Sequence, residues 1–240
     1  MGFGGPGQHA ERVFTGIFPN TRSNRWLHET LRTRAFLDHF GYGEGKVDPE
    51  LWLSEGDHAR AMSLLPGDGY LGLFVGAGSH LRQWPVAKWQ RLARRAGYAR
   101  IAVMGARTDL PVAERLVQGL QQDGTAYVNL AGKTSLRQLA ACIQRCEAVV
   151  SNDSCGVHFA VAGGVPSVGI LGGYHYGRYY PWGDPVRHRV AAAPMGCYYC
   201  NDACRYGDWR CVSDVSVDRV LFELRAALVG QRPEVQAGVI

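Results

Sequence analysis

Apolar segments of strand length alternate with segments of helical periodicity between residues 70 and 230. The short segments are almost continuously apolar, which is typical of strands buried on both faces of a sheet. Between them, apolar residues recur at the spacing of one helix face. The pattern predicts strands at 70–76, 100–105, 125–130, 147–151, 166–171 and 187–192, and helices at 86–96, 113–120, 136–143, 156–163 and 217–228.

Strands separated by helices of this length indicate an α/β fold, a Rossmann-like parallel sheet flanked by helices. The ligand site of such a sheet lies beyond the carboxyl ends of its strands. Residues 1–65 break the pattern, because they are glycine-rich and then polar, with one convincing helix at about 27–40. We therefore expect a domain at 66–230, preceded by a short helical lead-in and linker at 1–65.

The composition is that of an ordinary globular protein, with 46% hydrophobic and 20% charged residues in a chain of 240. Its formal charge of +5 comes from arginines spread along the chain. This disfavours nucleic acid as a partner and favours an anionic small molecule or a substrate at a membrane surface. The N-terminus lacks a charged start followed by an apolar core, so we expect a cytoplasmic protein.

The apolar stretch 157–173 raises the alternative of a membrane span. The stretch is short, however, and contains Gly163, Gly164 and Pro166. A helix, a turn and a strand explain it better than a transmembrane helix does.

The turn at 151–158, Ser-Asn-Asp-Ser-Cys-Gly-Val-His, lies between a predicted buried strand and a helix that begins near Gly156. A helix that starts there directs unpaired backbone N–H groups at the turn, and such groups suit a phosphate. Asp153 and Ser154 lie in this turn, and His158 lies in the first turn of the predicted helix. A structural interpretation stays open, in which Asp153 caps the helix and His158 is an ordinary first-turn histidine.

Two further turns follow predicted strands. In 76–85, Gly76 and Gly78 allow close approach of the backbone to a ligand, and Arg82 can pair with phosphate oxygens, although a plain strand–helix loop is equally open. In 104–109, Asp109 could hold ribose hydroxyls or serve as an acid at a helix N-terminus. Together the three turns predict a nucleotide-diphosphate site.

Three motifs carry a resemblance to a known family. Gly76-Ala77 is followed by Arg82-Gln83-Trp84-Pro85, residues 129–136 read Asn-Leu-Ala-Gly-Lys-Thr-Ser-Leu, and residues 153–158 read Asp-Ser-Cys-Gly-Val-His. In this order and spacing they resemble glycosyltransferase family 9, the bacterial ADP-heptose:lipopolysaccharide heptosyltransferases. Arg82 stands where the family has lysine, and Cys155 where it has glycine. The resemblance covers about residues 28–228 and corresponds to the C-terminal, donor-binding half of the GT-B fold.

The resemblance implies an inverting, metal-independent glycosyl transfer from an ADP-sugar. Arg82 would stabilise the departing diphosphate, Asp109 would bind ribose, and Thr134 would lie near the adenine. The implied donor-binding set is Gly76, Ala77, Arg82, Asp109, Thr134, Asp153, Ser154, Gly156 and His158.

The same resemblance bears on partners and completeness. The implied acceptor is lipopolysaccharide core or an autotransporter protein, with contact at the cytoplasmic face of the inner membrane. No general base is identified, because the family carries it in an N-terminal domain, of which 1–65 would be a remnant. A partner chain or a longer product would then supply that domain. The alternative is a non-catalytic module that binds nucleotide sugars.

Four of the seven cysteines, Cys197, Cys200, Cys204 and Cys211, fall within one polar and aromatic loop. Four thiolates at this spacing could close a tetrahedral zinc or iron site. The heptosyltransferases that modify autotransporters are similar in using cysteine-bound iron. Reduced thiols in a packed loop are the other interpretation, and disulfides are disfavoured by the expected compartment.

Overall fold

The computed structural model describes residues 2–4, 17–19, 27–44, 47–122 and 124–229. The chain divides into two compact units, Met1–Pro49 with Gly177–Tyr179, and Glu50–Tyr176 with Tyr180–Ile240. Within the described ranges, no helix is both long and apolar enough to cross a membrane.

The first unit contains the predicted helix and two strands that the sequence did not predict. β1 (Gly2–Gly4) pairs in parallel with β2 (Ile17–Pro19), and α1 spans Glu29–His39. Strands of this length are too short to display an alternating pattern. The ring of Phe18 packs edge-on against Phe36 at 5.9 Å, and Glu29 pairs with Arg32 and Arg178.

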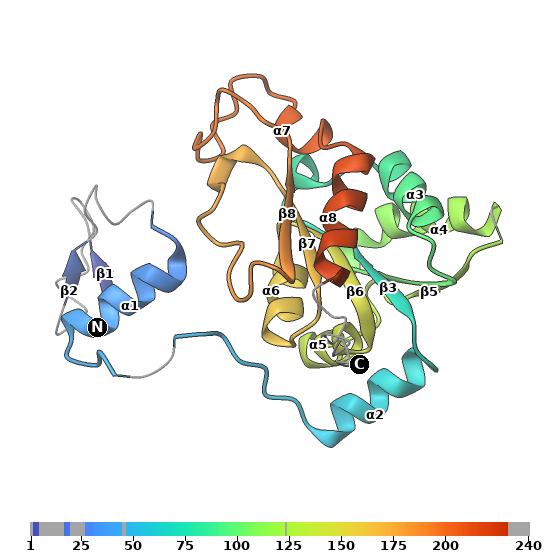
Figure 1. The fold of residues 1–240 in the computed structure, drawn as a ribbon, viewed down its shortest axis with the longest axis horizontal. Coiled ribbons are helices and arrows are strands. Elements are labelled where there is room, and N and C mark those ends of the chain that lie inside the picture. Colours follow the sequence, from blue (N-terminus) through green and yellow to red (C-terminus); the bar gives the residue numbers. More distant parts are fainter. Residues whose placement is uncertain (1, 5–16, 20–26, 45–46, 123, 230–240) are drawn as a thin grey trace, which may run out of the picture. The chain divides into compact units, whose positions relative to one another are not determined.

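The second unit is built on one six-stranded, wholly parallel sheet (Figure 1). Its strand order is β5-β4-β3-β6-β7-β8, which confirms the predicted Rossmann-like sheet. The strands are β3 (Tyr70–Phe74), β4 (Arg100–Met104), β5 (Ala126–Asn129), β6 (Cys146–Asn152), β7 (Ser167–Leu171) and β8 (His188–Ala192).

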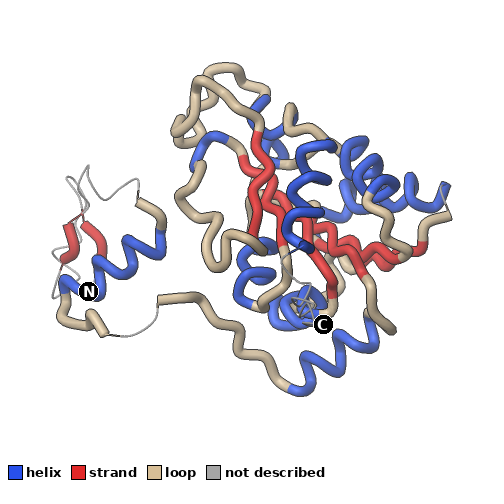
Figure 2. Tube along the Cα trace, in the orientation of Figure 1, coloured by secondary structure: helices blue, strands red, loops and turns tan. Residues whose placement is uncertain are grey.

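Helices cover both faces of this sheet (Figure 2). Along β3, Leu71 and Leu73 join the core on one face, whereas Tyr70 and Phe74 join the core on the other. The first face is covered by α3 (Val86–Arg95), α4 (Leu110–Gln122) and α8 (Val217–Val229), and the second by α2 (Glu55–Leu64), α5 (Leu136–Gln144) and α6 (Cys155–Ala162). All the predicted strands and helices of this unit are therefore present. The stretch 157–173 is a helix, a glycine turn and a strand, as expected.

α2 is an element that the sequence analysis missed. Ser54 caps it by accepting a hydrogen bond from the Asp57 backbone N–H, while the Asp57 carboxylate accepts one from the Ser54 N–H at 2.8 Å. Few apolar residues mark the helix, but Ala61 and the following Leu65 are fully buried in the same core as α5. The α/β unit accordingly begins at Glu50, whereas the sequence pattern placed the boundary at 66.

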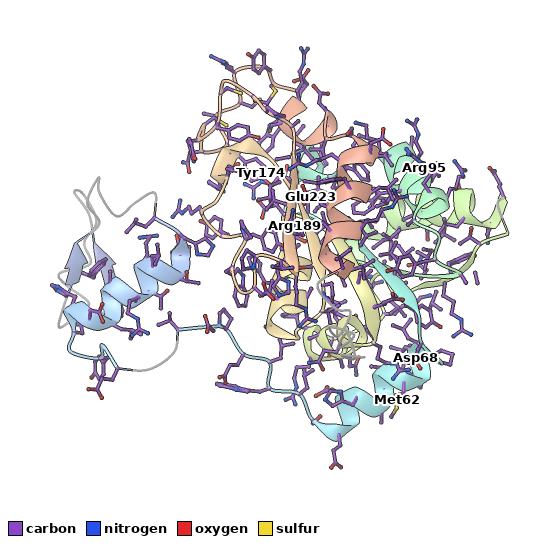
Figure 3. All side chains as sticks on the ribbon, viewed as in Figure 1. Met62, Asp68, Arg95, Tyr174, Arg189 and Glu223 are labelled. Carbon is purple, nitrogen blue, oxygen red and sulfur yellow. The ribbon has the colours of Figure 1, made fainter. Side chains whose placement is uncertain are left out.

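α8 is tied to the edge of the sheet by a buried charge. Glu223 on α8 is 2% exposed and pairs with Arg189 of β8 at 2.8 Å and with Arg219 at 2.7 Å (Figure 3). A buried carboxylate needs such partners, because leaving it unpaired is costly. The pairing holds α8 over β7 and β8.

Candidate functional site

Sheets of this kind bind ligands where two neighbouring strands connect to opposite faces, and in this sheet that point lies between β3 and β6. β3 and β6 are neighbours, but the chain leaves β3 for α3 on one face and leaves β6 for α6 on the other (Figure 1). The turns after the two strands therefore diverge, and the fold predicts a ligand-binding crevice at their carboxyl ends. These are two of the three turns singled out in the sequence.

Asn152 fastens the two strand ends together. It is fully buried, its amide donates to the Val75 carbonyl at 2.8 Å, and its oxygen accepts from the Trp84 N–H at 3.0 Å. Trp84 is anchored in turn, because its indole N–H donates to the Val215 carbonyl before α8. Asn152 was missed by sequence reasoning, although an amide that ends an apolar strand was the available signal.

Arg82 projects from this anchored turn. Its guanidinium lies over the ring of Tyr174 at 4.6 Å and the ring of Trp209 at 5.6 Å, and it pairs with the Asp202 carboxylate at 2.6 Å. Its Nε is buried and has no hydrogen-bond partner. A buried donor without a partner is costly in a folded protein, so this atom is suited to an acceptor from a ligand.

The turn after β6 faces Arg82. Burial raises the pKa of Asp153, and the Tyr174 hydroxyl, His158 and Arg82 partly oppose that shift, which places these side chains in one electrostatic environment. Tyr174, labelled in Figure 3, follows the end of β7. Burial raises the pKa of Tyr174, and the negative charge of Asp153 raises it further, so the Tyr174 hydroxyl keeps its proton beside Asp153.

The start of α6 offers the expected polar groups. Ser154 occupies the N-cap position without making a side-chain cap, and its buried hydroxyl has no hydrogen-bond partner. The alternative interpretation, in which Asp153 caps the helix, is wrong, because the N-cap residue is Ser154. A side chain at Gly156 would place its Cβ 2.6 Å from the Phe74 ring, so close packing on β3 accounts for this glycine. Gly156 can therefore reach a ligand only through its backbone.

The Asp109 carboxylate makes its main hydrogen bond within its own turn. It is 5% exposed, its carboxylate accepts from the Ala106 N–H at 2.8 Å, and the Gln83 amide lies at 3.4 Å. A Cβ on Gly76 would lie 2.2 Å from this carboxylate, which explains the glycine. The capping role that the sequence left open is present. A ribose contact stays a prediction, supported by a neighbouring cavity of about 390 Å³ lined by Asp109, Ala77 and Gln83.

Thr134 lies further from the crevice. It follows β5, the edge strand, which β4 separates from β3, and it is half-buried in the loop before α5. The structure thus brings Arg82, Asp153, Ser154 and His158 together at the centre and leaves Thr134 towards the edge. That placement agrees with a ligand extending across the strand ends, and an adenine contact at Thr134 stays a prediction.

The four clustered cysteines line one small cavity under the loop 197–211, which we call the cysteine loop. All are free thiols, and burial raises the pKa of Cys200 and Cys211, with the neighbouring thiols adding to the shift. No three His, Cys, Asp or Glu side chains in the described ranges are arranged to hold a metal ion. The residues as placed therefore do not fit the predicted zinc or iron.

The fold and the site define a class of protein. A Rossmann-like sheet with arginine, acid, hydroxyl and imidazole groups at its central crevice is a domain suited to nucleotide binding. Residues 17–209 match the sequence model of glycosyltransferase family 9 (heptosyltransferase), and the chain belongs to this family.

Relatives and solved structures agree with that assignment. Lipopolysaccharide heptosyltransferase 2 of Escherichia coli (strain K12) is 29% identical over 195 residues, covering 75% of this chain and 54% of the relative. The structure of E. coli ADP-heptose lipopolysaccharide heptosyltransferase II is 27% identical with a TM-score of 0.60, covering 76% of this chain and 54% of that one. The family 9 glycosyltransferase of Veillonella parvula DSM 2008 is similar in fold, with a TM-score of 0.75 at 20% identity over 95% of this chain and 67% of that one.

The chain spans about half the length of the E. coli relative that it matches. Its sheet corresponds to one Rossmann-like domain of the GT-B heptosyltransferases, as the resemblance implied.

Proposed function

We propose that this chain is the donor-binding part of a heptosyltransferase that takes ADP-heptose as donor and lipopolysaccharide core as acceptor. The observation that carries the proposal is Arg82, whose buried, unpartnered Nε lies in the same environment as Asp153 beside the start of α6. The names of the E. coli relatives specify lipopolysaccharide and ADP-heptose, which supports this choice of donor and acceptor. An autotransporter protein as acceptor has no comparable support.

The reaction is an inverting displacement at the anomeric carbon. The acceptor oxygen forms the new glycosidic bond as the bond between that carbon and the phosphate oxygen breaks, and ADP leaves with the electron pair. Arg82 and the backbone N–H groups of α6 neutralise the charge that develops on the diphosphate. The acceptor proton passes to a base, which we assign to the family's N-terminal domain, on a partner chain or a longer product.

Metal plays no part in the steps proposed for these residues. The four thiols are assigned here to a packed loop, and the metal prediction is tested separately by elemental analysis of anaerobically purified protein. Stoichiometric zinc or iron would restore a structural metal to the cysteine loop.

Calorimetry with ADP, ADP-heptose, ADP-glucose and UDP-sugars tests donor binding. We expect ADP-heptose to bind, and Asp153→Ala to weaken ADP-heptose more than ADP, because a carboxylate accepts hydrogen bonds from sugar hydroxyls. Asp68→Ala is the matched control, since the Asp68 side chain is 93% exposed. Absence of affinity for every nucleotide sugar would overturn the proposal.

A non-catalytic binding module is the second candidate, favoured by Cys155, which stands in the turn where the family has glycine. We expect the 240-residue chain to bind ADP-sugar and to transfer little or no heptose. Robust transfer by the purified chain would remove the second candidate and would locate a base within this sequence.

A further inference from the structure

The imidazole of His158 is held by an aromatic segment that the motif does not include. Trp182, between β7 and β8, donates from its indole nitrogen to His158 Nδ1 at 3.0 Å, with the two rings inclined by only 17°. The ring of Tyr180 meets the imidazole edge-on, at 6.4 Å and 79°. An indole N–H can donate but cannot accept, so Nδ1 must be the acceptor and the proton of the neutral ring resides on Nε2.

Trp182 is itself fixed on both sides. Tyr180 is 1% exposed, and its hydroxyl donates to the Arg189 carbonyl at 3.0 Å. Gly183 has φ of +78°, and a Cβ there would lie 2.7 Å from Val161 of α6. The segment therefore runs closely against α6, where only glycine fits. This packing holds the Trp182 indole at His158, which lies one turn into the same helix.

We propose that Trp182 is a positioning residue that keeps His158 in the Nε2–H tautomer. The inference rests on the proposed function, in which the crevice receives a nucleotide diphosphate sugar. His158 then meets an acceptor oxygen of the diphosphate or the sugar as a neutral hydrogen-bond donor, and it does not act there as a base. Arg82 contributes the positive charge, and His158 contributes a hydrogen bond whose geometry is fixed by the orientation of its ring. The two residues thus recognise the same ligand in different ways.

Nitrogen NMR of the 240-residue chain labelled with ¹⁵N-histidine tests the tautomer directly. The signal of His158 is assigned by its loss in His158→Gln. We expect an Nε2–H pattern for His158 in the wild-type chain and loss of that fixed pattern in Trp182→Phe, which keeps an aromatic ring but lacks the donor. Trp52→Phe is the matched control, because Trp52 is 84% exposed. An Nδ1–H pattern in the wild type would overturn the inference even if Trp182→Phe failed to fold.

Calorimetry with ADP-heptose and with ADP tests the consequence. We expect Trp182→Phe to weaken one or both ligands between about twofold and tenfold, the range of one hydrogen bond, with Trp52→Phe unchanged. Unchanged affinities in a folded Trp182→Phe would overturn the positioning role. If the wild-type chain bound neither ligand, the proposed function and the ligand half of this inference would fail together, whereas the NMR result would still decide the tautomer.

Discussion

The turns at the centre of the sheet and the cysteine loop meet at Arg82 but are held in place by different means. The turns after β3 and β6 continue buried strands and are joined by the side chain of Asn152. In the cysteine loop, Tyr199, Asn201, Asp202 and Trp209 all have positive φ, which is uncommon for residues other than glycine. That loop is fastened by bonds such as Tyr199 N–H to the Gly173 carbonyl at 2.7 Å.

The difference shows that the central turns are supported by the sheet itself, whereas the cysteine loop is attached to them by local contacts. The central turns present Arg82, Asp153 and Ser154 from strand ends that the whole sheet supports. The cysteine loop brings Asp202 and Trp209 to the same arginine through local contacts. Substitutions of the groups that join the strand ends, such as Asn152, should therefore affect the stability of the domain. Substitutions in the cysteine loop should have smaller effects, mainly on ligand affinity.

The largest effect should follow loss of the Asn152 amide. Asn152→Ala leaves the Trp84 N–H and the Val75 carbonyl buried without partners, so we expect a loss of about 3 kcal/mol in the free energy of unfolding, measured by urea denaturation. The same substitution at Asn201, an exposed residue of the cysteine loop, should cost only about 1 kcal/mol, mainly because alanine adopts the positive φ of this position less readily than asparagine does. Equal losses at the two sites would break the comparison.

Acidification should lower the free energy of unfolding through His188 of β8, the edge strand that leads into the cysteine loop. Burial lowers the pKa of His188 from 6.5 to about 4, with Arg187 adding to the shift. Between these pH values the unfolded chain binds more protons than the folded chain, so stability is lost as pH falls. We expect a loss of about 2 kcal/mol from this residue between pH 7 and pH 5.

His188→Gln provides the control for that pH dependence. Its free energy of unfolding should vary less between pH 7 and pH 5 than that of the wild type. An identical slope in both proteins would show that His188 is not the group responsible.

Arg82 should carry more of the ligand affinity than any residue of the cysteine loop. Arg82→Ala removes a charged hydrogen-bond donor, and we expect ADP to bind about tenfold more weakly by calorimetry. Arg91→Ala, at an exposed position on α3, is the matched control. ADP binding that survives the loss of Arg82 unchanged would contradict its assignment to the diphosphate.

The smallest effect should come from Asp202, and its sign is opposite. The Asp202 carboxylate pairs with the same guanidinium group to which we assign the diphosphate, so the two compete for it. Both side chains are partly exposed, so the ion pair is weak. Asp202→Asn should tighten ADP binding about threefold and leave adenosine unaffected. Asp208→Asn is the control, because Asp208 pairs with Arg210 in the same loop. Weaker ADP binding by Asp202→Asn would mean that Asp202 holds Arg82 in place.

Most of the fold could be predicted because the strands are buried on both faces and leave a continuous apolar signal. The runs at 70–76 and 147–151 became β3 and β6, and the helical periodicity of 136–143 became α5. α2 escaped because its burial rests on Ala61 and Leu65, too few positions to reveal a period. β1 and β2 escaped because they are only three residues long.

The sequence by itself determined the order of strands and helices from β3 onward and the turn that carries Asp153, Ser154 and His158, since these depend on local spacing and periodicity. Its motifs also identified the family. Only the tertiary structure decided which residues surround that turn. Trp182 and Tyr174 reach it from segments after β7, and Asp202 reaches Arg82 from the cysteine loop. Asn152 acts through strands that pairing alone makes neighbours. Contacts between distant segments depend on how the sheet assembles, and no local pattern encodes them.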